Sequence, residues 1–121
     1  MKKILSLKQN YQFQKAYKKG KFFVGRSMVV YAVRSNVANN RIGISVSKKI
    51  GKAVKRNRIK RLIKESYRIY RECVPAGIDF VFVARTTENT PTFKETTKEM
   101  KFLLKKLGMF NVEKWESLKE V

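Results

Sequence analysis

The chain has 121 residues and a formal net charge of +20, from 29 Lys or Arg against 9 Asp or Glu. This length fits one domain around a single core, and a hydrophobic content of 43% excludes a disordered chain. The composition also excludes much catalytic chemistry, because the sequence has no histidine. Its single cysteine, Cys73, rules out an intramolecular disulfide, as suits a reducing cytoplasm.

The positive charge is concentrated in the first half of the chain. The first acid is Glu65, so residues 1–64 have no negative side chain. A charge of this size repels itself in a monomer and indicates an anionic partner. We expect nucleic acid rather than a membrane, because the aromatic and apolar residues fit a core better than a lipid-facing stripe. No apolar run is long enough to span a bilayer.

The chain begins with a basic stretch, residues 1–8, that we expect to be loosely ordered. Asn10 to Lys19 is then predicted to form a short helix. Phe13, Ala16 and Tyr17 lie on one side of it at helical spacing. They either pack in the core or form an aromatic surface bordered by lysines, and the pattern leaves both interpretations open.

Three strands are predicted next. Lys21 to Val24 is a candidate edge strand, and Ser27 to Arg34, apolar on both alternations, is a candidate central strand. Arg41 to Ser47 alternates between branched apolar residues and small ones such as Gly43, so another group can approach its small-residue face closely. The polar turn between the second and third strands predicts that they form a hairpin.

A long amphipathic helix is predicted from about Lys52 to Cys73. Its apolar face carries Ile59, Leu62, Ile63, Ser66, Tyr67, Tyr70 and Cys73. Its opposite face is cationic, with Asn57, Lys60, Arg61, Lys64, Arg68 and Arg71, and with Arg56 at the border. Like charges at this spacing cost stability in an isolated helix, and a polyanion would relieve the repulsion. We therefore interpret this helix as binding nucleic acid.

The last third predicts a strand from Ile78 to Arg85 and a helix from Phe93 to Leu107. Thr92 and Glu95 have the spacing of a capping box at the start of that helix. Asn111 is a candidate cap for a final short helix. The order α-β-β-β-α-β-α predicts the α+β class and a two-layer α/β sandwich, with residues 1–121 as a single domain.

Motifs for a self-sufficient enzyme are missing. The carboxylates form no cluster of the kind that holds two metal ions for phosphodiester cleavage. Phosphate-loop, nucleophile-elbow and zinc-site spacings are also absent from the sequence. We therefore expect binding, not catalysis, from the side chains of this chain.

The stretch SVSKKIGKAVKRNRIKRLIKE, residues 45–65, resembles the signature of the bacterial ribonuclease P protein component. Its central RNR motif is Lys55-Arg56-Asn57-Arg58-Ile59-Lys60-Arg61. The resemblance extends to the first helix at Phe13 to Tyr17, to Val30-Tyr31 and to the strand Asp79 to Arg85, and it covers about residues 5–107. Residues 108–121 match no family feature and form a C-terminal extension.

This resemblance implies a function and a set of sites. In the family a large RNA is the catalyst, and the protein joins it to remove the 5′ leader of precursor tRNA. The implied partners are therefore ribonuclease P RNA and precursor tRNA, with no membrane and no obligate protein partner. The implied contacts to the catalytic RNA are Lys52, Arg56, Asn57, Arg58, Lys60, Arg61 and Lys64. The implied leader site comprises Phe13, Tyr17 and Tyr31.

The resemblance also implies magnesium ions in the holoenzyme, although no recognisable metal site in this chain holds one. The implied fold has a left-handed β-α-β crossover, and the implied location is the cytoplasm. Two positions depart from common family residues. Lys64 stands where arginine is common, which keeps the charge but loses the bidentate fork. Tyr17 stands where phenylalanine is usual, which preserves a stacking face.

Three other interpretations remain open on the residues alone. A ribosomal or other structural RNA-binding protein has the same bulk charge. A protein-only nuclease is disfavoured by the missing histidines and carboxylate cluster. A DNA-binding helix is disfavoured because the basic face lacks a recognisable dimer or recognition-helix context.

Overall fold

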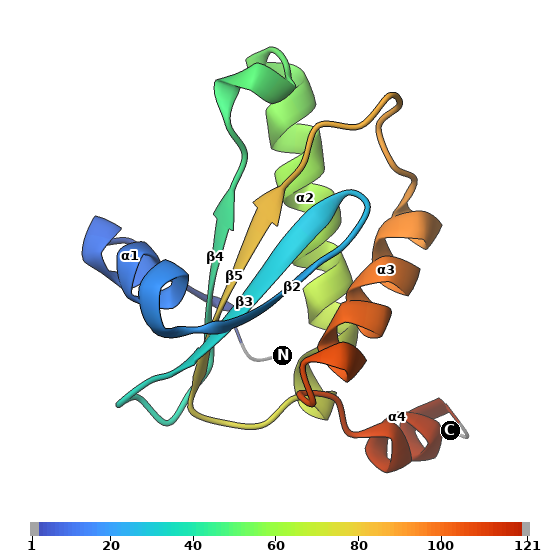
Figure 1. Ribbon diagram of the computed structural model, residues 1–121. Coiled ribbons are helices and arrows are strands. Elements are labelled where there is room, and N and C mark those ends of the chain that lie inside the picture. Colours follow the sequence, from blue (N-terminus) through green and yellow to red (C-terminus); the bar gives the residue numbers. More distant parts are fainter. Residues whose placement is uncertain (1–2, 120–121) are drawn as a thin grey trace.

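Five strands form one mixed sheet in the computed structural model, which describes residues 3–119 (Figure 1). In chain order they are β1 (Leu5–Ser6), β2 (Lys21–Val24), β3 (Met28–Arg34), β4 (Arg41–Ser45) and β5 (Ile78–Ala84). The helices are α1 (Asn10–Lys19), α2 (Ala53–Tyr70), α3 (Phe93–Lys106) and α4 (Val112–Lys119). Two 3-10 helices flank α2, at Lys48–Ile50 and Arg71–Cys73. The predicted α+β class and the order of the main elements are confirmed.

The strand order across the sheet is β1-β4-β5-β3-β2. β3 is antiparallel to both β2 and β5, whereas β4 is parallel to β5 and to β1. The predicted hairpin of Ser27–Arg34 with Arg41–Ser47 is therefore wrong, because β5 lies between β3 and β4. β5 lies between β3 and β4 because its side chains are apolar on both faces, and residues 78–82 are all buried there.

The parallel pair β4 and β5 is joined through α2. In Figure 1 both strands point upward, β4 lies to the left of β5 and α2 passes behind them. The crossover therefore has the left-handed sense that the resemblance implies. This connection places the N-terminal end of α2 just beyond the end of β4, and that position matters for the site.

Helices cover the two faces of the sheet unequally. α2 and α3 bury one face over the main core, which includes Val30, Phe80, Phe82, Ile63, Tyr67 and Leu103. α1 lies on the other face over a smaller cluster, formed by Leu7, Ala16, Val33 and Val81 with Phe13, Tyr17, Tyr31 and Val83 against it. The sheet and the α2–α3 layer make the predicted sandwich. The single short helix α1 leaves part of the second face uncovered.

The N-terminal segment is more ordered than its composition predicts. Leu5 and Ser6 pair in parallel with Arg41 and Ile42. Ile4 and Leu7 are both buried, one in each core cluster, so the apolar residues of this segment anchor it to both faces of the sheet edge. The expectation of a loose lead-in is wrong for residues 3–8, and residues 1–2 lie outside the described part of the chain.

The predicted helix ends are confirmed where a side chain defines them. The capping box at α3 forms, with Glu95 N–H donating to Thr92 Oγ1 at 3.1 Å and Thr92 N–H donating to Glu95 Oε1 at 2.9 Å. Asn111 caps α4, accepting from Lys114 N–H at 3.0 Å. The Asn111 N–H also donates to the Cys73 carbonyl at 2.7 Å, which ties α4 to the end of the long helix.

Candidate nucleic-acid interface

The start of α2 is set by an unusual backbone conformation at Gly51. Its φ is +155°, in a region that side-chain-bearing residues rarely adopt. The Gly51 N–H donates to the Lys48 carbonyl at 3.3 Å and closes the preceding 3-10 helix. Lys52 then becomes the N-cap of α2. This turn brings the lysines before the helix and the cations of its first turns into one region.

The implied contacts to RNA lie along the N-terminal two-thirds of α2, and we call this set the basic face. Of its members, five are exposed and two are half-buried: Lys52, Asn57, Arg58, Lys60 and Arg61, then Arg56 and Lys64. None of the ion pairs among residues 3–119 involves any of them. The apolar residues that alternate with them, such as Ile59 and Ile63, are buried and hold the helix on the core. The basic face is therefore presented outward without internal neutralisation.

The N-terminal end of α2 adds to this positive potential. The first turn contains no acid, and the side chain of Lys52 makes no capping hydrogen bond. The first backbone N–H groups of a helix have no intrahelical acceptor, and the helix dipole places partial positive charge on them. Together with the cations of the basic face they form a surface suited to phosphate oxygens.

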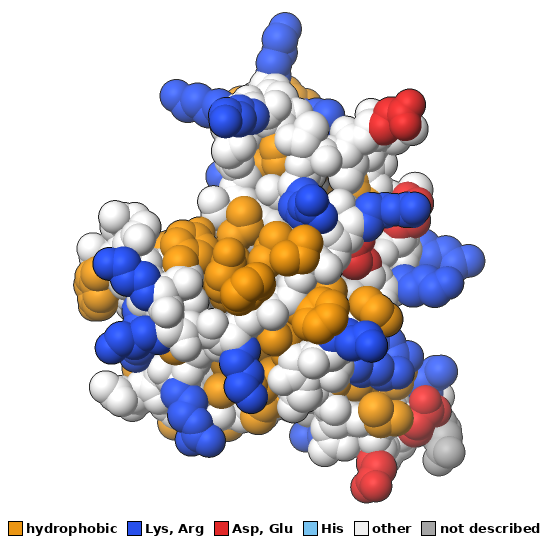
Figure 2. Space-filling view, viewed as in Figure 1, with side chains coloured by type: hydrophobic (Ala, Val, Ile, Leu, Met, Phe, Trp, Pro, Cys, Tyr) orange, Lys and Arg blue, Asp and Glu red, His pale blue; other side chains and the backbone are white. Residues whose placement is uncertain are grey.

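A second surface lies on the opposite face of the sheet, where α1 packs. Phe13 covers Gly43 so closely that a Cβ on Gly43 would stand 2.6 Å from the Phe13 ring. The rings of Tyr17 and Tyr31 meet edge to face, with centroids 5.0 Å apart. All three aromatic residues are half-buried, and we call them the aromatic face. Figure 2 shows an apolar patch over the sheet between α1 and α3, with cationic side chains around it.

Both interpretations of Phe13 and Tyr17 are therefore realised in part. Both residues pack on the smaller cluster, and both are only half-buried, so part of each remains accessible. Burial raises the pKa of the Tyr17 phenol, an effect that a hydrogen bond with Ser45 partly offsets. The hydroxyl thus stays neutral at ordinary pH and adds no negative charge to the surface.

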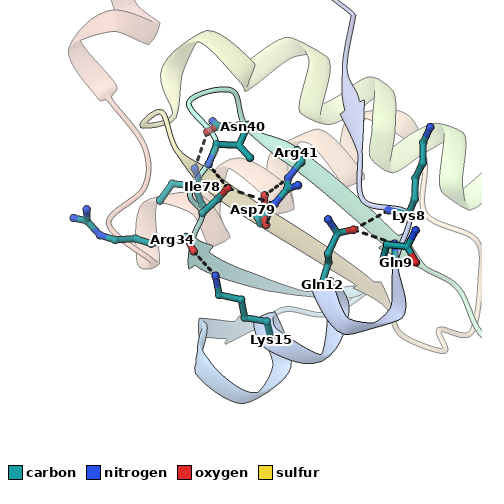
Figure 3. Close-up of polar contacts among 11 residues, drawn as sticks. Lys8, Gln9, Gln12, Lys15, Arg34, Asn40, Arg41, Ile78 and Asp79 are labelled. Atoms are coloured by element: carbon teal, nitrogen blue, oxygen red, sulfur yellow. Dashed lines mark hydrogen bonds and ion pairs between the residues drawn. The ribbon is translucent and has the colours of Figure 1, made fainter.

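Polar contacts fix α1 and the neighbouring strands in place (Figure 3). Lys15 Nζ donates to the Arg34 carbonyl at 3.2 Å, which ties α1 to the end of β3. Arg41 makes a two-pronged contact with Asp79, with Nε to Oδ1 at 2.9 Å and Nη2 to Oδ2 at 2.8 Å. These contacts hold the sheet beneath the aromatic face in register.

The two surfaces approach each other at β4. Ser45, the last residue of β4, lies beside Tyr17, and the basic face begins a few residues later at Lys52. The structure thus brings Phe13, Tyr17 and Tyr31 together and sets the basic face apart from them as a neighbouring surface.

The aromatic surface includes a ring that the sequence did not point to. Phe22 on β2 lies against Tyr31, with centroids 5.4 Å apart and ring planes 30° apart, and it is 57% exposed. The contact follows from the β2–β3 register, which pairs Phe22 with Tyr31. The one signal in the sequence is the run of apolar residues in a short edge strand, and it specifies neither register nor face.

Among residues 3–119 no group of three His, Cys, Asp or Glu side chains could hold a metal ion. Within the same residues no helix is both long enough and apolar enough to cross a membrane.

Comparisons with known proteins agree on one family. The family model for ribonuclease P matches residues 1–108. The ribonuclease P protein component of Clostridioides difficile is 46% identical over 101 residues, which cover 83% of this chain and 89% of that protein. That of Alkaliphilus oremlandii is 42% identical over 111 residues, covering 92% and 97%.

Solved structures give the same result. The Staphylococcus aureus RNase P protein superposes with a TM-score of 0.80 at 35% identity, covering 90% of this chain and 100% of that one. The RNase P protein of Thermotoga maritima gives a TM-score of 0.74 at 28% identity, covering 84% and 96%. The chain therefore belongs to the family of bacterial ribonuclease P protein components, which makes it part of an endoribonuclease that processes the 5′ ends of tRNAs.

Proposed function

We propose that this chain binds the catalytic RNA of ribonuclease P through the basic face and the single-stranded 5′ leader of precursor tRNA through the aromatic face. The observation that carries the proposal is the separation of two chemically different surfaces that adjoin at β4. One presents cations without ion-pair partners among the described residues, and the other presents accessible rings. Endonucleolytic removal of the leader then yields the mature 5′ end of the tRNA.

Each surface suits its proposed ligand for a physical reason. Double-helical RNA hides its base edges in a deep groove, so a protein that holds it depends on phosphates and shape, which Arg and Lys match. Asn57 both donates and accepts, so we assign it a specific hydrogen bond rather than general attraction. A leader offers unpaired bases, and each base stacked on an aromatic ring contributes about 1–3 kcal/mol.

The chemistry is assigned to the RNA subunit and to magnesium ions of the holoenzyme. The contribution of this chain is to hold the two RNAs together and to offset their mutual repulsion, which its charge of +20 favours. The proposed complex needs no further protein partner, and its place is the cytoplasm, where bacterial tRNA is made.

Cleavage of precursor tRNA at low magnesium tests this proposal. The protein alone, a bacterial ribonuclease P RNA alone and the mixture of the two are compared. Cleavage by the mixture, well above that by the RNA alone, is the expected result. Cleavage by the protein alone would overturn the assignment of the chemistry. A mixture no better than the RNA would favour a structural RNA-binding role.

A further inference from the structure

The sheet surface beside the aromatic face continues to the outer edge of the sheet. Phe22 lies against Tyr31, which in turn meets Tyr17, so the three rings form a continuous series from α1 to β2. Val24 points to the same side of β2 as Phe22 and is 50% exposed. Its neighbours across the strands, Val29 and Val83, are half-buried. An apolar surface with a protruding ring thus extends beyond the residues assigned to the leader.

The charges around this surface identify the kind of ligand that it fits. α1, β2, β3 and β4 contain no acid, and the single acid of β5, Asp79, is 3% exposed and paired with Arg41. Three glutamates, Glu88, Glu95 and Glu99, share a hollow with Val24 and Gly25, and Glu99 accepts hydrogen bonds there from Ser27 and Met28. Arg85 follows β5 and donates through its guanidinium to the carbonyl of Gly25, beside Val24. A second copy of this chain would bring the same positive charge to the surface. A single-stranded RNA brings bases for the rings and phosphates for the cations.

We infer that Phe22, supported by Val24 and flanked by Arg85, forms an outer base-binding subsite for the leader of precursor tRNA. The subsite rests on the proposed function, because it extends the path that begins at Phe13 and Tyr17. Phe22 stacks a base, and Arg85 contacts the adjoining phosphate. The subsite determines how many leader nucleotides the protein engages.

The position of β2 in the sheet decides which nucleotides reach the subsite. β4 leads into the basic face, and β2 is the outermost strand on the other side, beyond β5 and β3. A leader that starts near the catalytic RNA therefore passes Phe13, Tyr17 and Tyr31 before it meets Phe22. The outer subsite accepts the nucleotides farther from the cleavage site.

The test measures the affinity of the reconstituted holoenzyme for precursor tRNAs whose leaders are lengthened one nucleotide at a time. The scissile phosphate is modified to prevent cleavage. Phe22→Ala is compared with Phe23→Ala, a matched control on the same strand whose ring points to the opposite face of the sheet. Phe22→Tyr retains a stacking ring, and thermal unfolding of each free variant checks the fold.

Phe22→Ala is expected to reduce affinity about tenfold for long leaders and to leave short leaders unaffected. Phe22→Tyr and Phe23→Ala are expected to bind like the parent chain. An unchanged affinity of Phe22→Ala at every leader length would overturn the subsite, while a loss in Phe13→Ala would still uphold the proposed function. A loss of self-association in Phe22→Ala, with leader binding unchanged, would instead identify this edge as an interface between copies and also overturn the subsite.

Discussion

Asp79 is a buried carboxylate that forms an ion pair with one neighbour, Arg41. Both of its oxygens accept from the Arg41 guanidinium, and its side chain is 4% exposed against 23% for that of Arg41. The pair joins β4 to β5 directly beneath α1. The hydrogen bond to Asp79 raises the pKa of the Arg41 guanidinium above its ordinary value. The contact therefore stabilises the register on which the aromatic face depends.

Arg41→Ala is expected to lower the free energy of unfolding by about 3 kcal/mol, because it leaves a buried carboxylate without its partner. Urea titration of the free protein measures this change. Arg34→Ala is the control, since Arg34 is an exposed arginine at the end of the neighbouring strand and should change the stability by no more than about 0.5 kcal/mol. Equal effects of the two substitutions would contradict the role given to the pair.

Residue patterns predict the outward position of the cations on α2, whereas they predict the contacts of the aromatic surface only in part. Arg61 and its neighbours follow from helical periodicity, which is a local property of the sequence. The Tyr31–Phe22 contact depends on which strand β2 joins and in which register, and tertiary pairing decides both. The sequence indicated at Gly43 that another group could approach the sheet closely, because glycine has no bulky side chain. It did not indicate that this group is Phe13.

The entry into α2 is the element-level feature that sets where the proposed RNA-binding face begins. Gly51→Ala places a Cβ in a disfavoured backbone region and 2.8 Å from the Lys55 side chain. We expect a loss of about 1–3 kcal/mol in stability and a weaker affinity for the catalytic RNA, because the first turn of α2 must shift. Gel-shift titration with the RNA measures the affinity.

Gly108→Ala is the matched control for that change. Gly108 also has a positive φ, +72°, but it follows α3 and is remote in sequence from the basic face. The Gly108→Ala protein should be less stable than the parent chain and should bind the catalytic RNA with the same affinity. If both glycine variants lose RNA affinity in proportion to their loss of stability, the turn at Gly51 has no special role in positioning the helix.

α4 lies beyond the residues that match the family, yet it packs on the long helix. The Trp115 ring meets Tyr70 edge to face with centroids 5.1 Å apart, and Lys101 Nζ lies over the Trp115 ring, 5.2 Å from its centroid. Trp115→Ala should lower the free energy of unfolding by about 2 kcal/mol. Leu118→Ala, on the exposed side of the same helix, should not. Thermal unfolding compares the two variants.

Cleavage by the reconstituted holoenzyme separates a structural α4 from a functional one. Both α4 variants are expected to support cleavage at the parent rate at temperatures where they are folded, since α4 adjoins the end of α2 that is remote from the basic face. A large loss of cleavage in Trp115→Ala without a loss of stability would contradict a purely structural role.

Helices were easier to predict from this sequence than strand pairing. α1 begins and ends at the predicted residues, and Thr92 identified the start of α3, because periodicity and caps are local signals. The predicted hairpin failed because β4 pairs with β5, which follows more than thirty residues later. β1 was missed because two paired residues leave no strand pattern.

At the scale of the whole molecule, charge and family together specify the function. The excess of positive charge fits a ribosomal protein as well as a ribonuclease P protein, so composition alone could not choose between them. The central motif supports the choice, and the family match over residues 1–108 confirms it. The fold then adds what neither provides, by placing an aromatic face next to a basic one across β4.

The central claim is that these two surfaces have separate tasks, and one comparison tests it directly. Arg61→Ala and Phe13→Ala holoenzymes are assayed for assembly with the catalytic RNA over a range of salt concentrations. Both are also assayed for binding precursor tRNA with and without a leader. Arg61→Ala should weaken assembly and reduce its salt slope by about one.

Phe13→Ala should leave assembly intact and lose about 1–3 kcal/mol of binding energy only with substrates that carry a leader. If the two substitutions instead weaken the binding of leaderless tRNA equally, the division of labour between the basic face and the aromatic face is contradicted.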